Sequence, residues 1–86
     1  MGKPKIYIKK LGRYRINGHQ VIGMADTDTN EIWLDPRQTD CEFRETALHE
    51  RFHISFPDWS EFKIQKIAKA FNNYLIEVEN IKTKLK

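Results

Sequence analysis

Two histidines and a glutamate in the segment "ALHERFH" form a pattern that suits metal chemistry. His49 and His53 are four residues apart, so on a helix both imidazoles project to the same side and can hold one ion. Glu50 lies about 100° further round the helix, where its carboxylate can take a proton from a water molecule bound to that ion. The H-E-x-x-H spacing therefore predicts a zinc (Zn2+) site that activates water for hydrolysis.

A catalytic zinc site needs a third protein ligand and one open position, and the sequence offers four candidates for the third ligand. Glu61 is preferred, because a tight turn at "FPD" would fold the next helix back beside the histidines. Asp58 is the second candidate, although Asp58 and Glu61 also have the spacing of a helix capping box. The others are His19, on a predicted strand, and Cys41, about two turns before His49 and expected to be a buried thiol.

The residues around the motif resemble a known family. The segment "ALHERFHISFPDWSE" is similar to the small phage and prophage-type zincin metallopeptidases related to the ImmA/IrrE group. In that group H-E-x-x-H is followed by a short turn and an acidic residue that opens the next helix. The segment "GMADTDTNEIWLDPRQTD" looks like the strand–turn–strand that precedes the motif helix, so the resemblance covers roughly residues 20–80.

The resemblance implies a minimal zincin-like fold and hydrolysis of a peptide bond. Under it, His49 and His53 are zinc ligands, and Glu61 is the third ligand. Glu50 is implied as the general base that activates the zinc-bound water. The strand "EIWL" is implied as the sheet edge along which a peptide substrate adds as an extra strand.

The chain departs from two other zincin patterns. The glycine and the third histidine that follow the motif in metzincins are absent from "HERFHISFPDW". The distant helical glutamate of gluzincins would have to be Glu77 or Glu79, several turns along the second helix, and we disfavour both. The sequence assigns no histidine, tyrosine or arginine to stabilisation of an oxyanion.

Extended segments are predicted at about residues 5–35, and they should form a small antiparallel sheet of three or four strands. Asn17-Gly18 between two extended runs indicates a hairpin, and "DTDTN" indicates a second turn. Pro36 ends the last strand because proline cannot donate to a sheet ladder.

Two helices should follow, at about residues 40–55 and 59–82, which gives an α+β fold class. Thr39 and Glu42 have capping-box spacing at the first helix, and apolar residues on two sides of that helix predict that it is sandwiched between other elements. The second helix carries an apolar stripe that is predicted to pack on the sheet or on the first helix. This stripe consists of Ile64, Ile67, Ala68, Phe71, Tyr74, Leu75, Val78 and Ile81.

Composition limits the class of protein. The 86 residues, 40% of them hydrophobic, fit a single domain spanning residues 1–86. One cysteine excludes an internal disulfide and the structural zinc sites built on several cysteines. The sequence shows no signal peptide and no apolar run of the roughly 20 residues that span a membrane. We therefore expect a cytoplasmic protein with no membrane partner.

Basic and acidic residues are concentrated in different parts of the chain, and this distribution suggests alternative functions. Residues 26–61 carry ten acidic residues and three arginines, a negative field that favours a bound cation. Residues 1–25 carry six basic residues and no acidic one, so a basic nucleic-acid-contacting N-terminal part is an alternative to a solvated surface. The main alternative to a peptidase is a non-catalytic zinc-binding module, structural or regulatory, because so small a domain leaves little wall for a substrate cleft.

Overall fold

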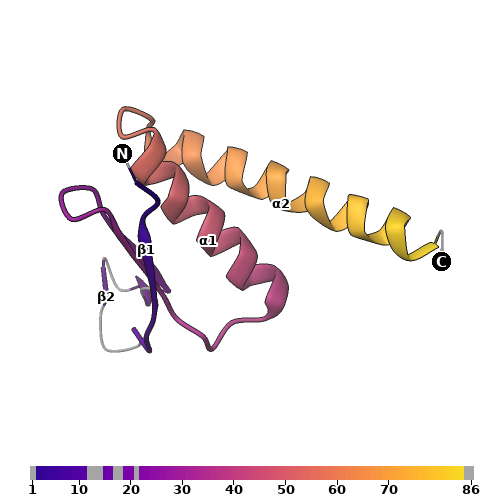
Figure 1. The fold of residues 1–86 in the computed structure, drawn as a ribbon, viewed down its shortest axis with the longest axis horizontal. Coiled ribbons are helices and arrows are strands. Elements are labelled where there is room, and N and C mark those ends of the chain that lie inside the picture. The colour runs from indigo at the N-terminus through magenta and orange to yellow at the C-terminus, as the bar shows by residue number, and fades with distance from the viewer. Residues whose placement is uncertain (1, 12–14, 17–18, 21, 85–86) are drawn as a thin grey trace.

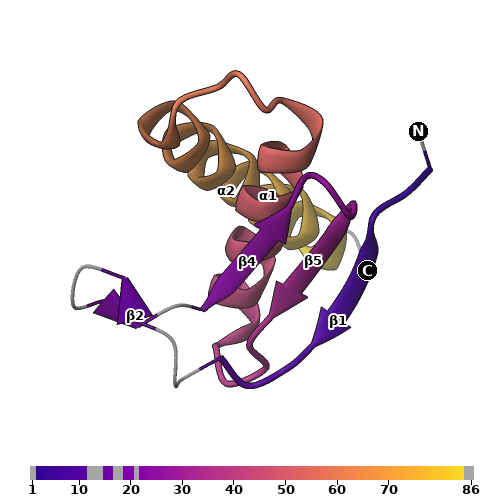
Figure 2. The ribbon, with the colours of Figure 1, turned by 90° about the vertical axis from the view of Figure 1, so that its left-hand side faces the viewer.

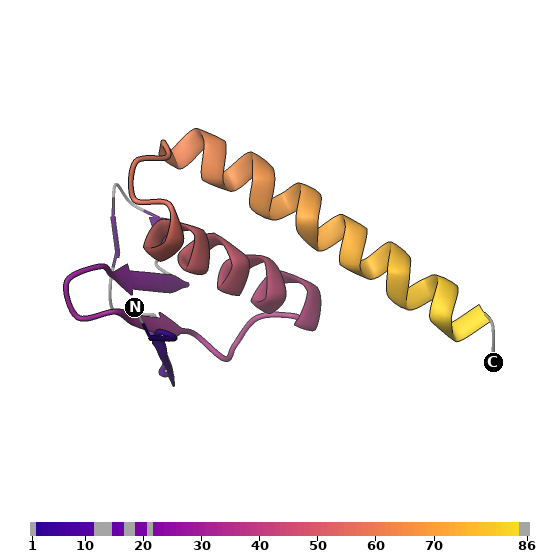
Figure 3. The ribbon, with the colours of Figure 1, turned by 45° about the horizontal axis from the view of Figure 1, so that its top comes forward.

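The computed structural model of the chain describes residues 2–11, 15–16, 19–20 and 22–84. It has three layers, with helix α1 lying between a small sheet and helix α2 (Figures 1 and 3). The expected α+β class, a small sheet followed by two helices, is confirmed. The sandwiched position predicted for the first helix is confirmed as well. None of the described helices is both long enough and apolar enough to cross a bilayer.

The sheet has three strands, with β5 in the middle (Figure 2). Its strands are β1 (Lys5–Ile8), β4 (Gly23–Asp26) and β5 (Glu31–Leu34). β4 and β5 form an antiparallel hairpin, in which Asp26 Oδ1 accepts the amides of Asp28 and Thr29 at 2.9 and 3.2 Å. Asn30 completes the turn with a φ of 58°, a conformation that asparagine tolerates well. The predicted turn at "DTDTN" is therefore confirmed.

The pairing of β1 differs from the all-antiparallel expectation, because β1 runs parallel to β5. Residues 9–30 separate the two strands, a length sufficient for the crossover that a parallel pair requires. The prediction that "EIWL" forms the edge was therefore wrong. That segment is β5, which is paired on both sides, and the described edge strands are β1 and β4.

A separate two-stranded ribbon confirms the first hairpin. β2 (Arg15–Ile16) pairs antiparallel with β3 (His19–Gln20). The Asn17-Gly18 turn that the sequence predicts between them lies outside the described residues.

Helix α1 (Asp40–Ser55) begins where the sequence predicts. The Thr39 hydroxyl accepts the Glu42 amide at 3.2 Å and donates to the Glu42 carboxylate at 2.9 Å. These bonds satisfy a free N–H group of the first turn and link the capping side chains. The face of α1 toward the sheet covers Ile32 and Leu34, which are both 2% exposed and alternate with outward-facing strand residues.

A buried carboxylate fixes the junction between the sheet and α1. Asp35 is 2% exposed, accepts the Leu11 amide at 2.8 Å and pairs with Arg37 at 2.9 Å. Hydrogen bonds and charge from Arg37 hold the pKa of Asp35 well below its usual range. The carboxylate thus ties the segment after β1 to the segment after β5.

Helix α2 (Glu61–Lys84) begins slightly later than predicted and packs over only part of its length. Ile64 and Ala68 are buried, and Asn72 donates to the Cys41 carbonyl at 3.1 Å and to Cys41 Sγ at 3.4 Å. Beyond Asn72 the predicted apolar stripe is exposed, so the expectation that all of it packs was wrong. The expectation of a buried thiol was also wrong, because Cys41 is exposed at the N-terminal end of α1.

Candidate metal centre

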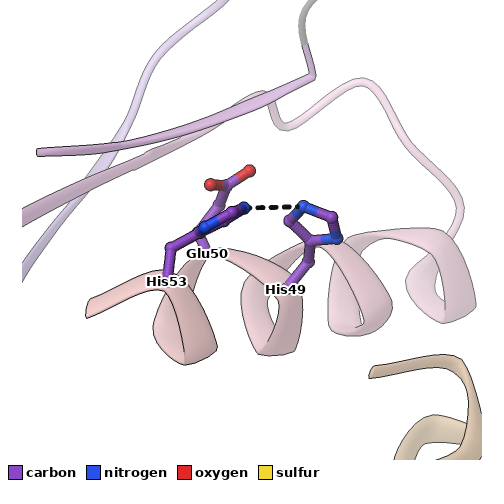
Figure 4. A group of neighbouring side chains, drawn as sticks. All are labelled: His49, Glu50 and His53. Carbon is purple, nitrogen blue, oxygen red and sulfur yellow. Dashed lines mark hydrogen bonds between the residues drawn. The ribbon is translucent and has the colours of Figure 1, made fainter. Parts of the chain in front are cut away.

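Helix α1 presents the three motif residues from one side (Figure 4). His49 Nε2 and His53 Nε2 lie 3.1 Å apart, as the spacing of one helical turn predicts. A carboxylate oxygen of Glu50 lies within 4.8 Å of donor nitrogens of both histidines. Both histidines are partly exposed, whereas Glu50 is only 9% exposed.

The turn after α1 is held by a hydrogen bond and by stacked rings. Phe56 leaves the helical region with φ −133° and ψ 69°, as expected of a residue before proline. The Trp59 amide donates to the Phe56 carbonyl at 3.0 Å, and the two rings stack with centroids 4.0 Å apart. Ser60 then caps α2 by accepting the Lys63 amide at 3.1 Å. This turn folds α2 back so that its first residue faces α1.

The first residue of α2, Glu61, meets both histidines. Its Oε1 lies 2.6 Å from His49 Nε2, and its Oε2 lies 2.8 Å from His53 Nε2. Two imidazole nitrogens and one carboxylate that converge on one point make a three-ligand set of the type that catalytic zinc uses. The donor set therefore fits one zinc ion, with two ligands from α1 and one from α2.

Glu50 lies apart from this pairing and points toward the sheet. Because glycine has no side chain, the backbone of Gly23 in β4 lies close to the Glu50 side chain. A Cβ at position 23 would lie 3.0 Å from Glu50 Oε2 and 2.5 Å from Thr46 Cγ2. Burial, and secondarily the negative charge of Glu61, raise the pKa of Glu50 to about 7. Such a carboxyl group can exchange a proton near neutral pH.

A cavity of about 520 Å³ opens beside these residues, and its walls come from the start of β4, from α1 and from α2. The lining includes Ile22, Gly23, Glu45, Thr46, His49, Glu50, Glu61, Gln65, Ala68 and Lys69. The cavity reaches from the edge of the sheet to Gln65, Ala68 and Lys69, which lie in the first and second turns after Glu61 on α2. It therefore offers space for a substrate next to the candidate metal ligands.

The other candidates for a third ligand have different positions. Among the described acids, Glu61 is the one that pairs with both motif histidines, whereas Asp58 is exposed in the turn. The predicted capping box of Asp58 and Glu61 is not formed, because Ser60 caps the helix. Cys41 lies by Asn72 at the far end of α1. The side chain of His19 lies outside the described residues.

Two residues near Glu50, Gly23 and Thr46, were not predicted from the sequence. Gly23 permits the close approach of β4, and Thr46 packs against it while donating to Gln38 Oε1 at 2.7 Å. Gln38 in turn donates to the carbonyls of Asp35 and Ile22 at 2.8 and 3.3 Å, which ties α1 to β4. A glycine within a strand pattern is a signal of close backbone approach, and Gly23 in "HQVIGMA" carries that signal.

Comparison with known proteins finds no family model, curated protein or solved structure that matches the chain.

Proposed function

We propose that this protein is a zinc-dependent peptidase. The observation that carries the proposal is the convergence of His49, His53 and Glu61 beside a buried carboxylate, Glu50, that takes no part in the pairing. Three side chains are thus available to hold the metal while a fourth is free for proton transfer. A single cysteine, Cys41, suits action in the reducing cytoplasm.

In this proposal the residues of the chain have distinct tasks. When bound, a zinc ion would polarise the scissile carbonyl and lower the pKa of the attacking water. Glu50 would take a proton from the attacking water and pass it to the leaving amine. Burial beside Gly23 raises the pKa of Glu50 to about 7 in the metal-free chain, and in this proposal its carboxylate serves as the base while Glu61 serves as the ligand. His49 and His53 would hold the metal through their ring nitrogens.

Among the described strands, β4 lies at an edge of the sheet, and this edge would supply a binding surface for a peptide. β4 pairs with β5 on one side, and its first residue, Gly23, lines the cavity together with Ile22. An extended peptide that adds to this edge would gain main-chain hydrogen bonds. One of its peptide bonds would then lie over the metal ligands. In this proposal β4, and not the "EIWL" strand β5, is the strand to which the peptide adds.

The substitution Glu50→Gln tests the catalytic role. It preserves the shape of the side chain and removes the basic group, so cleavage of a denatured protein or of a peptide library should fall by at least about 100-fold. Zinc content should stay at one ion per chain, because the three proposed ligands are intact. Unchanged cleavage in Glu50→Gln would refute the assignment.

A second candidate is a structural zinc module, and one observation favours it. His49 and His53 belong to α1 whereas Glu61 belongs to α2, so a bound ion would fasten the two helices together. In that case a chelator should lower the melting temperature strongly, and cleavage should be absent from the wild type. Melts and cleavage assays on the same zinc-loaded sample separate the two candidates.

A further inference from the structure

Helix α2 extends well beyond the helix on which it packs (Figures 1 and 3). Asn72 contacts the carbonyl of Cys41, the second residue of α1, so the N-terminal end of α1 lies level with Asn72. Residues 73–84 therefore form an overhang, about 18 Å long at 1.5 Å per residue. This α2 overhang is helical throughout.

The α2 overhang carries large apolar side chains in contact with solvent. Tyr74 is 60% exposed, Ile81 53%, Val78 43% and Leu75 40%, and Phe71 just before them is 50% exposed. All five lie on one side of the helix, because their spacing follows the helical period. A contiguous apolar surface of this kind marks an interaction site.

The spacing of this apolar face is that of a coiled coil. Alternating steps of three and four residues connect Ile64, Ile67, Phe71, Tyr74, Val78 and Ile81. This is the a and d pattern of a heptad repeat, by which one helix packs against another. The start of the pattern lies over α1, where Ile64 is buried. In the sequence the next step falls on Leu85, outside the described residues.

Charges on the two flanks of the apolar face complement each other between two copies of the helix. Glu77 and Lys82 occupy the g and e positions on opposite flanks of the stripe, five residues apart. In a parallel pair of identical helices, Glu77 of each chain faces Lys82 of the other chain. We propose that the α2 overhang is the dimerisation surface of this protein, and that it pairs in parallel with the overhang of a second copy.

The proposed dimer leaves the candidate metal centre open. Glu61 is the first residue of α2, at the opposite end of the helix from the overhang. The pairing of two overhangs therefore covers neither the cavity nor the free edge of β4. This inference does not depend on the proposed peptidase activity, and either one can fail without the other.

Sedimentation analysis of the full chain tests the proposal across concentrations from about 1 µM to about 1 mM. The wild type should pass from a 10.3 kDa monomer to twice that mass as concentration rises. Val78→Glu, at an a position, should raise the dimer dissociation constant by at least about tenfold. Asn80→Glu is the matched control, since it adds the same charge on the opposite side of the overhang and should leave dimerisation unchanged.

A charge exchange tests the parallel arrangement. Glu77→Lys or Lys82→Glu alone should weaken the dimer by roughly threefold, and the double exchange should restore wild-type affinity. A wild type that stays monomeric at every concentration would overturn the proposal. A dimer that Val78→Glu leaves intact, or that the double exchange fails to restore, would overturn it as well.

Discussion

At the residue scale, the distinctive feature is a buried glutamate, Glu50, beside two histidines that are candidate metal ligands. The H-E-x-x-H spacing predicts that His49 and His53 face one way and that Glu50 is offset, and the structure shows this arrangement. The spacing could not predict the burial of Glu50. That burial comes from β4, a strand distant in sequence, and from the absence of a side chain at Gly23.

Burial of Glu50 predicts an effect of pH on stability. Folding raises the pKa of Glu50 from 4.5 to about 7, so the folded chain binds this proton more tightly than the unfolded chain does. The resulting stabilisation is fully present below about pH 4.5 and is lost as pH rises through about 7. The amide introduced by Glu50→Gln is uncharged at every pH, so the variant does not undergo this loss.

The metal-free Glu50→Gln variant should therefore be more stable than the metal-free wild type at about pH 8, by up to about 3 kcal/mol. The difference should vanish toward about pH 4.5. Denaturant unfolding of both proteins in the presence of a chelator measures it. Parallel stability curves for the two proteins over this range would contradict the burial assigned to Glu50.

Gly23 is predicted to be essential for the placement of Glu50. A Cβ at this position would lie 2.5 Å from Thr46 Cγ2, and Thr46 is held by its bond to Gln38. Gly23→Ala should therefore cost about 1–3 kcal/mol of unfolding free energy and lower cleavage by the zinc-loaded protein. Met24→Ala serves as the control, because the next residue of a strand points to the opposite face. Equal activity in both variants would argue against the positioning role.

At the element scale, the position of Glu61 beside the two histidines depends on where helix α2 begins. The sequence indicates a break at "FPD" and a helix start near Asp58, but it does not show which residue caps the helix. The structure shows Ser60 as the cap and Glu61 as the first helical residue, held by a turn in which Phe56 stacks on Trp59. The Phe56–Trp59 stack lies in the turn between the two helices, so helical periodicity does not predict it.

The cap of α2 should matter for metal binding. Ser60→Ala removes the acceptor of the Lys63 amide and loosens the turn that carries Glu61. It should cost about 1 kcal/mol of unfolding free energy and weaken zinc binding several-fold. Thr39→Ala removes the corresponding cap at the distant end of α1. It should cost a similar free energy and leave zinc affinity unchanged, as competition with a chelating dye can measure. If Ser60→Ala and Thr39→Ala bind zinc with equal affinity, Glu61 is not a zinc ligand.

The order and direction of the strands could not be predicted from local sequence patterns. The hairpins at Asn17-Gly18 and "DTDTN" are predicted because a turn is encoded within a few residues. The parallel pairing of β1 with β5 joins segments more than twenty residues apart, and an exposed "KIYI" strand has no local feature that fixes its direction. The edge assigned to "EIWL" was wrong for the same reason.

At the scale of the whole molecule, the candidate metal ligands lie at one end of α2 and a solvent-exposed apolar face lies at the other. The sequence predicts the apolar stripe, but it could not show how much of it the body of the domain covers. That limit is set by the length of α1, whose N-terminal end lies at the level of Asn72. A domain this small has one core, and the second half of α2 lies beyond it.

The most direct test of the account is a crystal structure of the zinc-loaded protein with anomalous data collected at the zinc absorption edge. We predict one ion, bound at about 2.0–2.2 Å by His49 Nε2, His53 Nε2 and the carboxylate of Glu61, with Glu50 outside the ligand set. An ion held by Glu50 instead of Glu61 would contradict the proposed division between ligand and base. The absence of an anomalous peak between α1 and the start of α2 would contradict the metal centre itself.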